Sequence, residues 1–228
     1  MTHCRLCSEN TIHFIWQDYE GGNWFHCESC GSHSSSHSYA DTQKYYTAEY
    51  ITQHHGGISL EEERNQLTTN INWFEDYKPD IHGRDFLDIG CCRGVAMTMM
   101  AERGWAVHGF DVIPEAAQPG CSTIAPSFRA GLFPQKYHAV MCREVIEHVD
   151  HPMQMLTEIA AVIHKGGYLQ LQTPRPAATM NPIGYQGAHI TLMSPLWIRY
   201  WLERLGFEVR DYRLWSNPGG QCWMAKRL

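Results

Sequence analysis

Short apolar runs alternate with helical patterns from residue 84 to the end of the chain, which indicates strands separated by helices. Strands are predicted at 86–89, 106–110, 121–125, 137–142, 168–172, 207–214 and 221–226, and helices at 95–103, 114–118, 152–164 and 195–205. The last two strands flank a turn at 217–220, which makes one of them antiparallel. This order predicts an α/β fold with a doubly wound, mostly parallel seven-stranded sheet of the Rossmann-like type.

The N-terminal segment has a different pattern. Aromatic and β-branched residues at 12–16 and 24–25 flank a turn at 20–23, which predicts a hairpin. Residues 31–38 are small and polar, and we expect them to form an exit loop or linker.

Two helical patterns follow, at 41–50 and 60–77, and both precede the predicted sheet. Together with the hairpin, they divide the chain into three expected parts. These are a small module over 1–40, a helical linker or cap over 41–83, and an α/β domain over 84–228.

Composition narrows the function classes. The chain has 228 residues, and its 18 Lys and Arg against 24 Asp and Glu give a formal charge of −6. This balance lacks the basic footprint of a nucleic-acid-binding protein. No apolar run approaches the about 18 residues of a membrane helix, and the N-terminus does not resemble a secretory leader. We expect a soluble, cytoplasmic protein.

Nine cysteines would suggest disulfides in a short secreted chain, but the number is odd and Cys91 is adjacent to Cys92. Four others form two CxxC pairs with 19 residues between them. This spacing is typical of a zinc ribbon, in which each pair gives two thiolates to one tetrahedral ion. The predicted zinc ligands are Cys4, Cys7, Cys27 and Cys30.

Two alternatives to a four-cysteine zinc site are open. Redox chemistry at one CxxC normally requires a helix start in a thioredoxin-like unit, which the pattern lacks. A nearby histidine can replace a cysteine ligand; the candidates are His3, His26, His33 and His37. Four cysteines leave no open coordination position, so the zinc would be structural and would supply folding free energy to the small module.

The most informative stretch is residues 86–94, where an apolar strand run ends in a glycine-bearing turn and enters a helix. The spacing is DxGxxxG, and neither the phosphate-loop motif nor GxGxxG is present. It resembles the first motif of the class I S-adenosylmethionine-dependent methyltransferases, LDIGCGxG. The resemblance implies cofactor contacts at Asp88, Gly90, Cys91, Cys92 and Gly94.

One position departs from that pattern, because Cys92 stands where the family has its middle glycine. A side chain there costs roughly 1 to 2 kcal/mol if the backbone is left-handed. At the end of the next strand, Asp111 and Val112 lie where such folds bind a ribose, whose two hydroxyls a carboxylate can accept. The alternative for Asp111 is a helix cap before Pro114.

Residues 137–149 resemble the fourth-strand motif of the same family, YDxVxxxxVxEHV, with His138 in place of the usual acid. The resemblance implies that Cys142 and Arg143 line the methionine end of the cofactor. No acid follows the third strand, so we expect backbone and Phe128 to hold the adenine. The resemblance spans about 84–228 and is nearest to small-molecule methyltransferases, including quinone-type O-methylating enzymes and sugar methyltransferases with an N-terminal zinc module.

Three side chains are candidates for catalysis: Glu147, His148 and His189. A histidine can accept a proton from a hydroxyl or activated carbon, with Tyr185 as a possible hydrogen-bonding partner. Each of the three can equally have a packing or capping role. Residues 173–188 are expected to form the acceptor pocket. The tyrosines Tyr45, Tyr46 and Tyr50 form either a lid or core packing.

We therefore predict an S-adenosylmethionine-dependent methyltransferase acting on oxygen, nitrogen or carbon of a small molecule. One rival is an RNA methyltransferase that uses the zinc module to grip nucleic acid, which the acidic balance disfavours. Another is a non-catalytic module in which Cys92 has degraded the cofactor turn. Cofactor binding separates that module from the enzymes, and salt-sensitive RNA binding separates the two enzymes.

Overall fold

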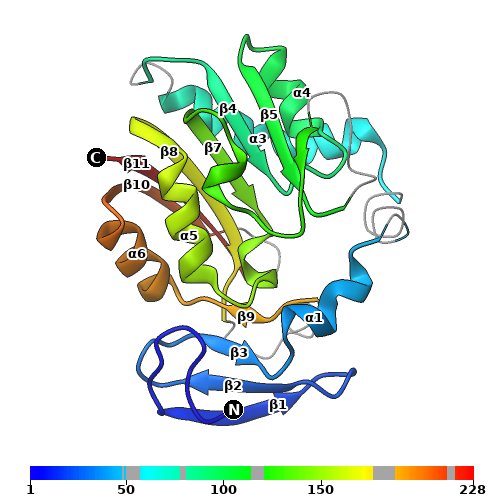
Figure 1. The fold of residues 1–228 in the computed structure, drawn as a ribbon, viewed down its shortest axis with the longest axis vertical. Helices are drawn as coiled ribbons and strands as arrows, with labels where there is room; N and C mark the ends of the chain where they lie inside the picture. Colours follow the sequence, from blue (N-terminus) through cyan, green and yellow to red (C-terminus); the bar gives the residue numbers. More distant parts are fainter. Residues whose placement is uncertain (48, 50–56, 78–80, 114–120, 177–187, 215–218) are drawn as a thin grey trace. The chain divides into compact units, whose positions relative to one another are not determined.

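The computed structural model describes the chain except for residues 48, 50–56, 78–80, 114–120, 177–187 and 215–218 (Figure 1). The described residues divide into two compact units, each assembled from separate stretches of sequence. The first unit is Met1–Lys44, Arg143–Thr157 and Leu171–Ala225; the second is Tyr45–Cys142, Glu158–Gln170 and Lys226–Leu228. The part boundaries expected at 40 and 83 stay a prediction.

Seven strands form the larger sheet, in the order β10-β11-β8-β7-β4-β5-β6. Their bounds are β4 Asp85–Ile89, β5 Ala106–Asp111, β6 Cys121–Ile124, β7 Tyr137–Arg143, β8 Ile163–Pro174, β10 Phe207–Leu214 and β11 Gly220–Arg227. Strand β4 pairs in parallel with β5 and β7, and β5 with β6. The predicted mostly parallel seven-stranded sheet is confirmed.

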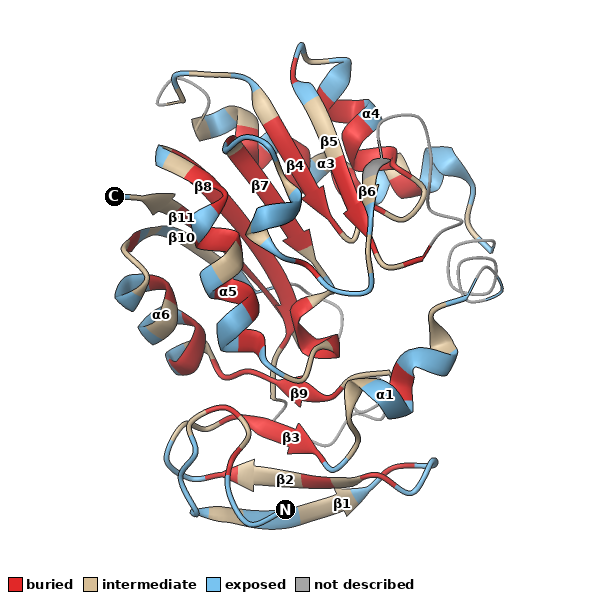
Figure 2. Cartoon of the chain, in the orientation of Figure 1, coloured by how far each residue is buried: buried red, intermediate tan, exposed pale blue. Residues whose placement is uncertain are grey.

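Strand β4 forms the centre of the second unit. Its residues Phe86, Leu87 and Ile89 have no exposed surface (Figure 2). Phe86 pairs with Val107 of β5 on one side and Ala139 of β7 on the other. Burial of apolar residues that point to opposite sides suits a parallel strand that is covered on both faces.

Helix α3, Leu60–Tyr77, has the predicted bounds. Ser59 and Glu62 form a capping box at its start, since each side chain bonds the other residue's backbone N–H. One face buries Leu67, Ile71 and Phe74, and the Phe74 ring meets Phe86 edge-on with centroids 5.9 Å apart. This stripe packs the helix onto the core of the second unit.

The first unit contains a second sheet with the order β1-β2-β3-β9 (Figure 1). Its strands are β1 Ile12–Gln17, β2 Asn23–Cys27, β3 His33–Ser35 and β9 Thr191–Leu192, so the predicted hairpin is present. The prediction of an exit loop over 31–38 is wrong for His33–Ser35, which form β3. Ser34 pairs with Phe25 and with Thr191. A distant strand supplies this pairing, and a local pattern cannot reveal it.

Two predicted helices differ from the structure at their ends. Where a helix is expected over 41–50, the described residues form a short α1, Tyr39–Thr42, capped by Ser38 and followed by the 3-10 turn Gln43–Tyr45. Residues 48 and 50 lie outside the described residues. The helix expected over 152–164 ends earlier, since α5 is Pro152–Ala161 and β8 already includes His164.

The remaining described helices are α4 Val95–Ala101 and α6 Pro195–Arg204, with short 3-10 turns at Ala130–Leu132 and Ile146–His148. Ser194 caps α6, because its hydroxyl accepts a hydrogen bond from the Trp197 N–H at 3.1 Å. Within the described ranges, no helix has the length and apolar character needed to cross a membrane.

Candidate functional site

In the second unit, the turn after β4 joins the strand to helix α4 through two glycines in the left-handed region. Gly90 and Gly94 have φ values of 79° and 71°, so both use the left-handed region that favours glycine. The N–H groups of Gly90 and Cys91 donate to the carbonyl of Phe110 on β5, at 2.8 and 3.0 Å. Helix α4 starts at the next residue, Val95, so the turn is held between the end of one strand and the start of a helix.

Cys92 takes the same left-handed region, with a φ of 43°. Its N–H donates to the Asp111 carboxylate at 2.9 Å, which holds the strained residue in place. Burial raises the pKa of the Cys92 thiol to about 11, with Asp111 as a second cause, so the thiol is neutral at pH 7. The sequence identified this position correctly as the place where a side chain occupies a glycine conformation.

Asp111 is 6% exposed at the end of β5. One carboxylate oxygen accepts from Cys92, and the other accepts from the Ile113 N–H at 2.9 Å. An ionised carboxylate has about four acceptor sites, so two sites are left for further donors. The pair of ribose hydroxyls is the donor set expected from the sequence, and this role stays a prediction.

An ion pair that the sequence analysis missed supports the turn. Arg93 donates through Nε and Nη2 to one carboxylate oxygen of Glu63 on α3, the Nε distance being 2.8 Å. It also donates through Nη1 to the carbonyl of Ile58 at 3.3 Å. Glu63 is 6% exposed. The 30 residues between the two charges explain why no local motif revealed the pair.

The predicted acid and histidines come together in the first unit. Ile146–His148 is a 3-10 turn, and Glu147 on it has no exposed surface. The Thr173 hydroxyl donates to Glu147 Oε2 at 2.9 Å. The rings of His148 and His189 lie 4.7 Å apart, centroid to centroid. The structure thus brings all three catalytic candidates to one place.

His148 is oriented by the backbone. Its Nδ1 lies 2.8 Å from the Ala188 carbonyl, which can only accept, so Nδ1 carries the proton. The other ring nitrogen, Nε2, lies 3.7 Å from Glu147 Oε1. In the neutral form of His148 with the proton on Nδ1, Nε2 is the nitrogen that can accept a proton.

Glu144 is a second residue that the sequence analysis missed. It follows β7 with a φ of 53°, in the region that side chains rarely adopt. Gln172 fixes it twice, by donating from Nε2 to the Glu144 carboxylate and by accepting from the Glu144 N–H. Burial, and then the nearby Glu144, raise the pKa of Glu147 well above its usual value. Two glutamates three residues apart at a strand end were the signal in the sequence.

The same cluster has the composition of a metal site. One ligand atom each from Glu147, His148 and His189 lies within 4.8 Å of the others. One carboxylate and two imidazoles suit a divalent transition metal such as zinc or iron. The geometry is therefore compatible with proton transfer and with metal binding.

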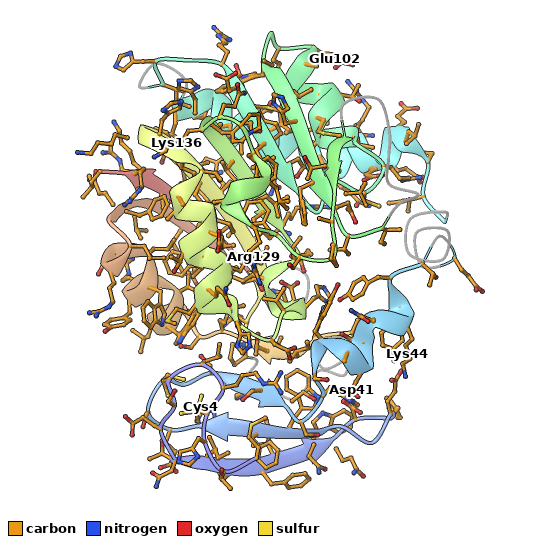
Figure 3. The ribbon with its side chains drawn as sticks, in the orientation of Figure 1. Cys4, Asp41, Lys44, Glu102, Arg129 and Lys136 are labelled. Atoms are coloured by element: carbon orange, nitrogen blue, oxygen red, sulfur yellow. The ribbon has the colours of Figure 1, made fainter. Side chains whose placement is uncertain are left out.

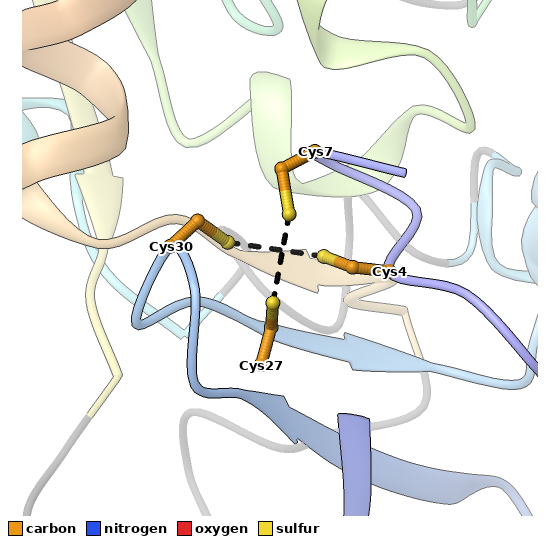
Figure 4. A group of neighbouring side chains, drawn as sticks. All are labelled: Cys4, Cys7, Cys27 and Cys30. Carbon is orange, nitrogen blue, oxygen red and sulfur yellow. Dashed lines mark hydrogen bonds between the residues drawn. The ribbon is translucent and has the colours of Figure 1, made fainter. Parts of the chain in front are cut away.

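The four predicted zinc ligands converge in the first unit (Figure 4). The Cys4 and Cys30 sulfurs are 3.8 Å apart, and those of Cys7 and Cys27 are 3.5 Å apart. Sulfurs held about 2.3 Å from a tetrahedral zinc lie roughly 3.8 Å from one another. The hydrogen bond from Cys4 lowers the pKa of Cys30 to about 5, so one thiolate forms readily. The residues fit the ion.

The other predicted site residues differ in how far they are buried. Asp88 and Cys142 are buried at the ends of β4 and β7, and Val112 and Arg143 are half-buried. Phe128, expected near the adenine, is 5% exposed and packs edge-on against Phe110 at 5.2 Å. The residues Pro114, Tyr50, Tyr185 and most of the segment 173–188 lie outside the described residues.

Comparison with known proteins defines the class. A family model described as a methyltransferase domain matches residues 60–212, and the chain belongs to this family. The matched region contains the glycine turn, Asp111 and the Glu147–His148–His189 cluster.

Two curated relatives and one solved structure are similar to it. The chain is 27% identical over 168 residues to ubiquinone biosynthesis O-methyltransferase of Aeromonas salmonicida, covering 68% of this chain and 66% of that protein. It is 29% identical over 161 residues to the protein of the same name from Leptothrix cholodnii, and the match covers 65% of this chain and 64% of that protein. The chain thus spans less than two thirds of these relatives.

The solved structure is 1,6-didemethyltoxoflavin-N1-methyltransferase of Burkholderia thailandensis. It aligns with a TM-score of 0.63 and 12% identity, over 94% of this chain and 99% of that one. At this identity the likeness shows the fold alone.

Proposed function

We propose that the protein transfers a methyl group from S-adenosylmethionine to a small-molecule acceptor. The observation that carries this proposal is the turn after β4, where Asp111 holds the Cys92 N–H and keeps acceptor capacity for a ribose. We assign cofactor binding to Asp88, Gly90, Cys91, Cys92, Gly94, Asp111, Val112, Cys142 and Arg143. Family membership over residues 60–212 supports the assignment.

The cofactor, when bound, would supply a methyl group on a sulfonium sulfur. In-line attack by the acceptor would form the new bond to the methyl carbon, and the sulfur would depart as a thioether. The task of the chain is to align donor and acceptor and to keep water out. We assign the proton of an acceptor hydroxyl to His148 Nε2, because the Nδ1 bond to the Ala188 carbonyl orients the ring and makes Nε2 the accepting nitrogen of the neutral imidazole. His189, whose ring lies beside that of His148, binds and orients that hydroxyl, and the buried Glu147 supports the His148 ring. The names of the curated relatives favour oxygen as the methylated atom.

We further propose that Cys4, Cys7, Cys27 and Cys30 hold a structural zinc ion, because their four sulfurs have tetrahedral spacing. A filled thiolate shell has no open position, so this ion takes no part in methyl transfer. A zinc site of this kind needs reduced cysteines, so we place the protein in a reducing compartment such as the cytoplasm.

Methyl transfer can be tested directly with tritiated S-adenosylmethionine and a panel of phenols, carboxylic acids and amines. We expect label in at least one phenol, and a His148→Ala variant to lower kcat by about 10²- to 10⁴-fold, as for loss of a general base. Glu28→Gln, an exposed carboxylate in the same unit, is the control. Label that enters only added RNA would contradict the small-molecule proposal. If added Mg²⁺ or Zn²⁺ is required for turnover, the cluster holds a metal and His148 is a ligand instead.

A further inference from the structure

The loop of the first CxxC pair is bonded to the segment that carries the acceptor residues. Arg5 lies between Cys4 and Cys7, and its Nη1 donates to Asp150 Oδ1 at 2.9 Å. Asp150 is two residues after His148. The same oxygen also accepts from the Tyr39 N–H at 3.0 Å. The Arg5 side chain is 19% exposed and the Asp150 side chain 35%, so the bond is partly shielded from water.

A second set of bonds starts at the other CxxC pair. The Ser194 hydroxyl donates to the Cys30 carbonyl, and the Ser194 N–H donates to the Ser32 hydroxyl at 2.9 Å. Strand β3 then pairs with β9, with His33 opposite Leu192. Both links connect the cysteine module to the segment that follows His189.

Backbone bonds extend this connection to the glutamate. The Ser35 N–H donates to the Ile190 carbonyl at 2.8 Å, and the Ile190 N–H donates to the Glu147 carbonyl at 2.8 Å. His189 precedes Ile190 directly. An unbroken series therefore runs from β3 through Ile190 to Glu147, and the Arg5 bond reaches the same segment from the other side.

We propose that the four-cysteine module is a positioning element of the acceptor site, and that Arg5 is a positioning residue that acts through Asp150 on Glu147 and His148. The inference rests on the proposed function for the meaning of the acceptor site, but the link itself is a property of the fold. With metal bound, the Cys4–Cys7 loop is rigid enough for Arg5 to hold Asp150. Without metal, the loop loses its covalent anchor, and residues 144–150 and 188–192 lose two of their supports.

The test is hydrogen exchange on the zinc-loaded protein, read by mass spectrometry at residues 144–150 and 188–192. We expect Arg5→Ala to raise exchange at least fivefold in 144–150, while zinc content stays at one ion per chain. Arg5→Lys retains a positive donor and should restore most of the protection. The control is Lys44→Ala, a residue of the same unit that is labelled in Figure 3. It removes an ion pair with Glu20 of the same 2.9 Å length.

A companion measurement separates this proposal from the proposed function. S-adenosylhomocysteine affinity should change less than twofold in Arg5→Ala, because the cofactor turn belongs to the second unit. If the wild-type protein does not bind S-adenosylhomocysteine, the proposed function fails while the exchange result still tests the link. Unchanged exchange in 144–150 for Arg5→Ala, or equal loss in Arg5→Lys and Arg5→Ala, overturns the proposal.

Zinc removal gives an independent readout if Arg5→Ala folds poorly. Stripping the wild-type protein with a chelator should increase exchange in 144–150 and 188–192, and re-addition of Zn²⁺ should reverse it. Exchange in residues 86–94 serves as the internal reference and should stay slow. Equal loss of protection in 86–94 and 144–150 would mean that zinc supports the whole fold, and it would overturn a specific positioning role.

Discussion

The turn proposed to bind the cofactor and the Glu147–His148–His189 cluster proposed to bind the acceptor are built in opposite ways. The turn is contiguous, since Gly90, Cys92 and Gly94 lie within five residues and Asp111 follows one strand later. The acceptor cluster draws Glu147, Thr173 and His189 from three separate segments. A binding loop made of backbone is specified locally, whereas a site made of side chains depends on the tertiary structure. A site made of side chains can therefore be disturbed by substitutions at more positions that are distant from it in the sequence.

The largest expected effect is on the zinc content and folding of the first unit, which contains the four cysteines and the Glu147–His148–His189 cluster. Cys27→Ser removes one of four zinc ligands, and structural zinc contributes about 10 kcal/mol or more to small modules. We expect bound zinc to fall from one ion per chain to none and the buried Trp24 to become exposed to solvent. Metal analysis and tryptophan fluorescence measure both. A variant that retains zinc and native fluorescence would show that the sheet of the first unit does not depend on the ion.

The next effect tests whether the turn depends on its ion pair with helix α3. Arg93→Ala leaves Glu63 buried without its partner, which costs about 3 kcal/mol by analogy with other buried pairs. The matched control is Arg64→Ala on α3, next to Glu63, because its pair with Glu102 is exposed and water screens it, so its loss should change stability little. Urea unfolding measures the free energies. Equal losses in both variants would mean that the turn does not need the ion pair.

Protonation of Glu147 gives a pH-dependent effect. Burial and Glu144 raise its pKa in the folded state, so the folded protein binds a proton that the unfolded chain releases above about pH 4.5. Stability is therefore greatest below that pH and falls as pH rises toward the raised pKa, by at most about 1.4 kcal/mol per pH unit from this group.

Glu147→Gln should remove that slope, because glutamine does not ionise. The free energy of unfolding, measured in urea between pH 5 and 8, should depend less on pH than in the wild-type protein. The exposed Glu28→Gln serves as the control and should keep the wild-type slope. Identical slopes for Glu147→Gln and the wild type would contradict a neutral Glu147.

The smallest effect concerns the departure from the glycine pattern. Cys92→Gly removes the strain of a side chain on a left-handed backbone, but it also adds conformational freedom to the unfolded chain. The net change in unfolding free energy should therefore stay within about 1 kcal/mol. Cys91→Gly has no such strain to relieve and removes a buried side chain, so it should destabilise more. Urea unfolding of the two variants compares them. A larger loss for Cys92→Gly would mean that the thiol itself supports the turn.

What the sequence could reveal follows the same division. The strands of the large sheet, helix α3 and the four cysteines carry their signals in local pattern and spacing, and these were predicted. Strand β3 is polar and three residues long, and it is a strand only because β2 and β9 flank it. Glu63 likewise gains its role through a fold that brings α3 to the turn. Such features depend on long-range pairing, which periodicity does not encode.

Calorimetric titration with S-adenosylhomocysteine tests the central claim most directly. The protein should bind it with a roughly micromolar Kd. Asp111→Ala should weaken binding at least tenfold, since a charged hydrogen bond is worth about 1.5 to 3 kcal/mol. Glu102→Ala, an exposed carboxylate on the same unit, should not change it. Absence of binding by the folded wild-type protein, or equal affinity in Asp111→Ala, would contradict a cofactor site at this turn.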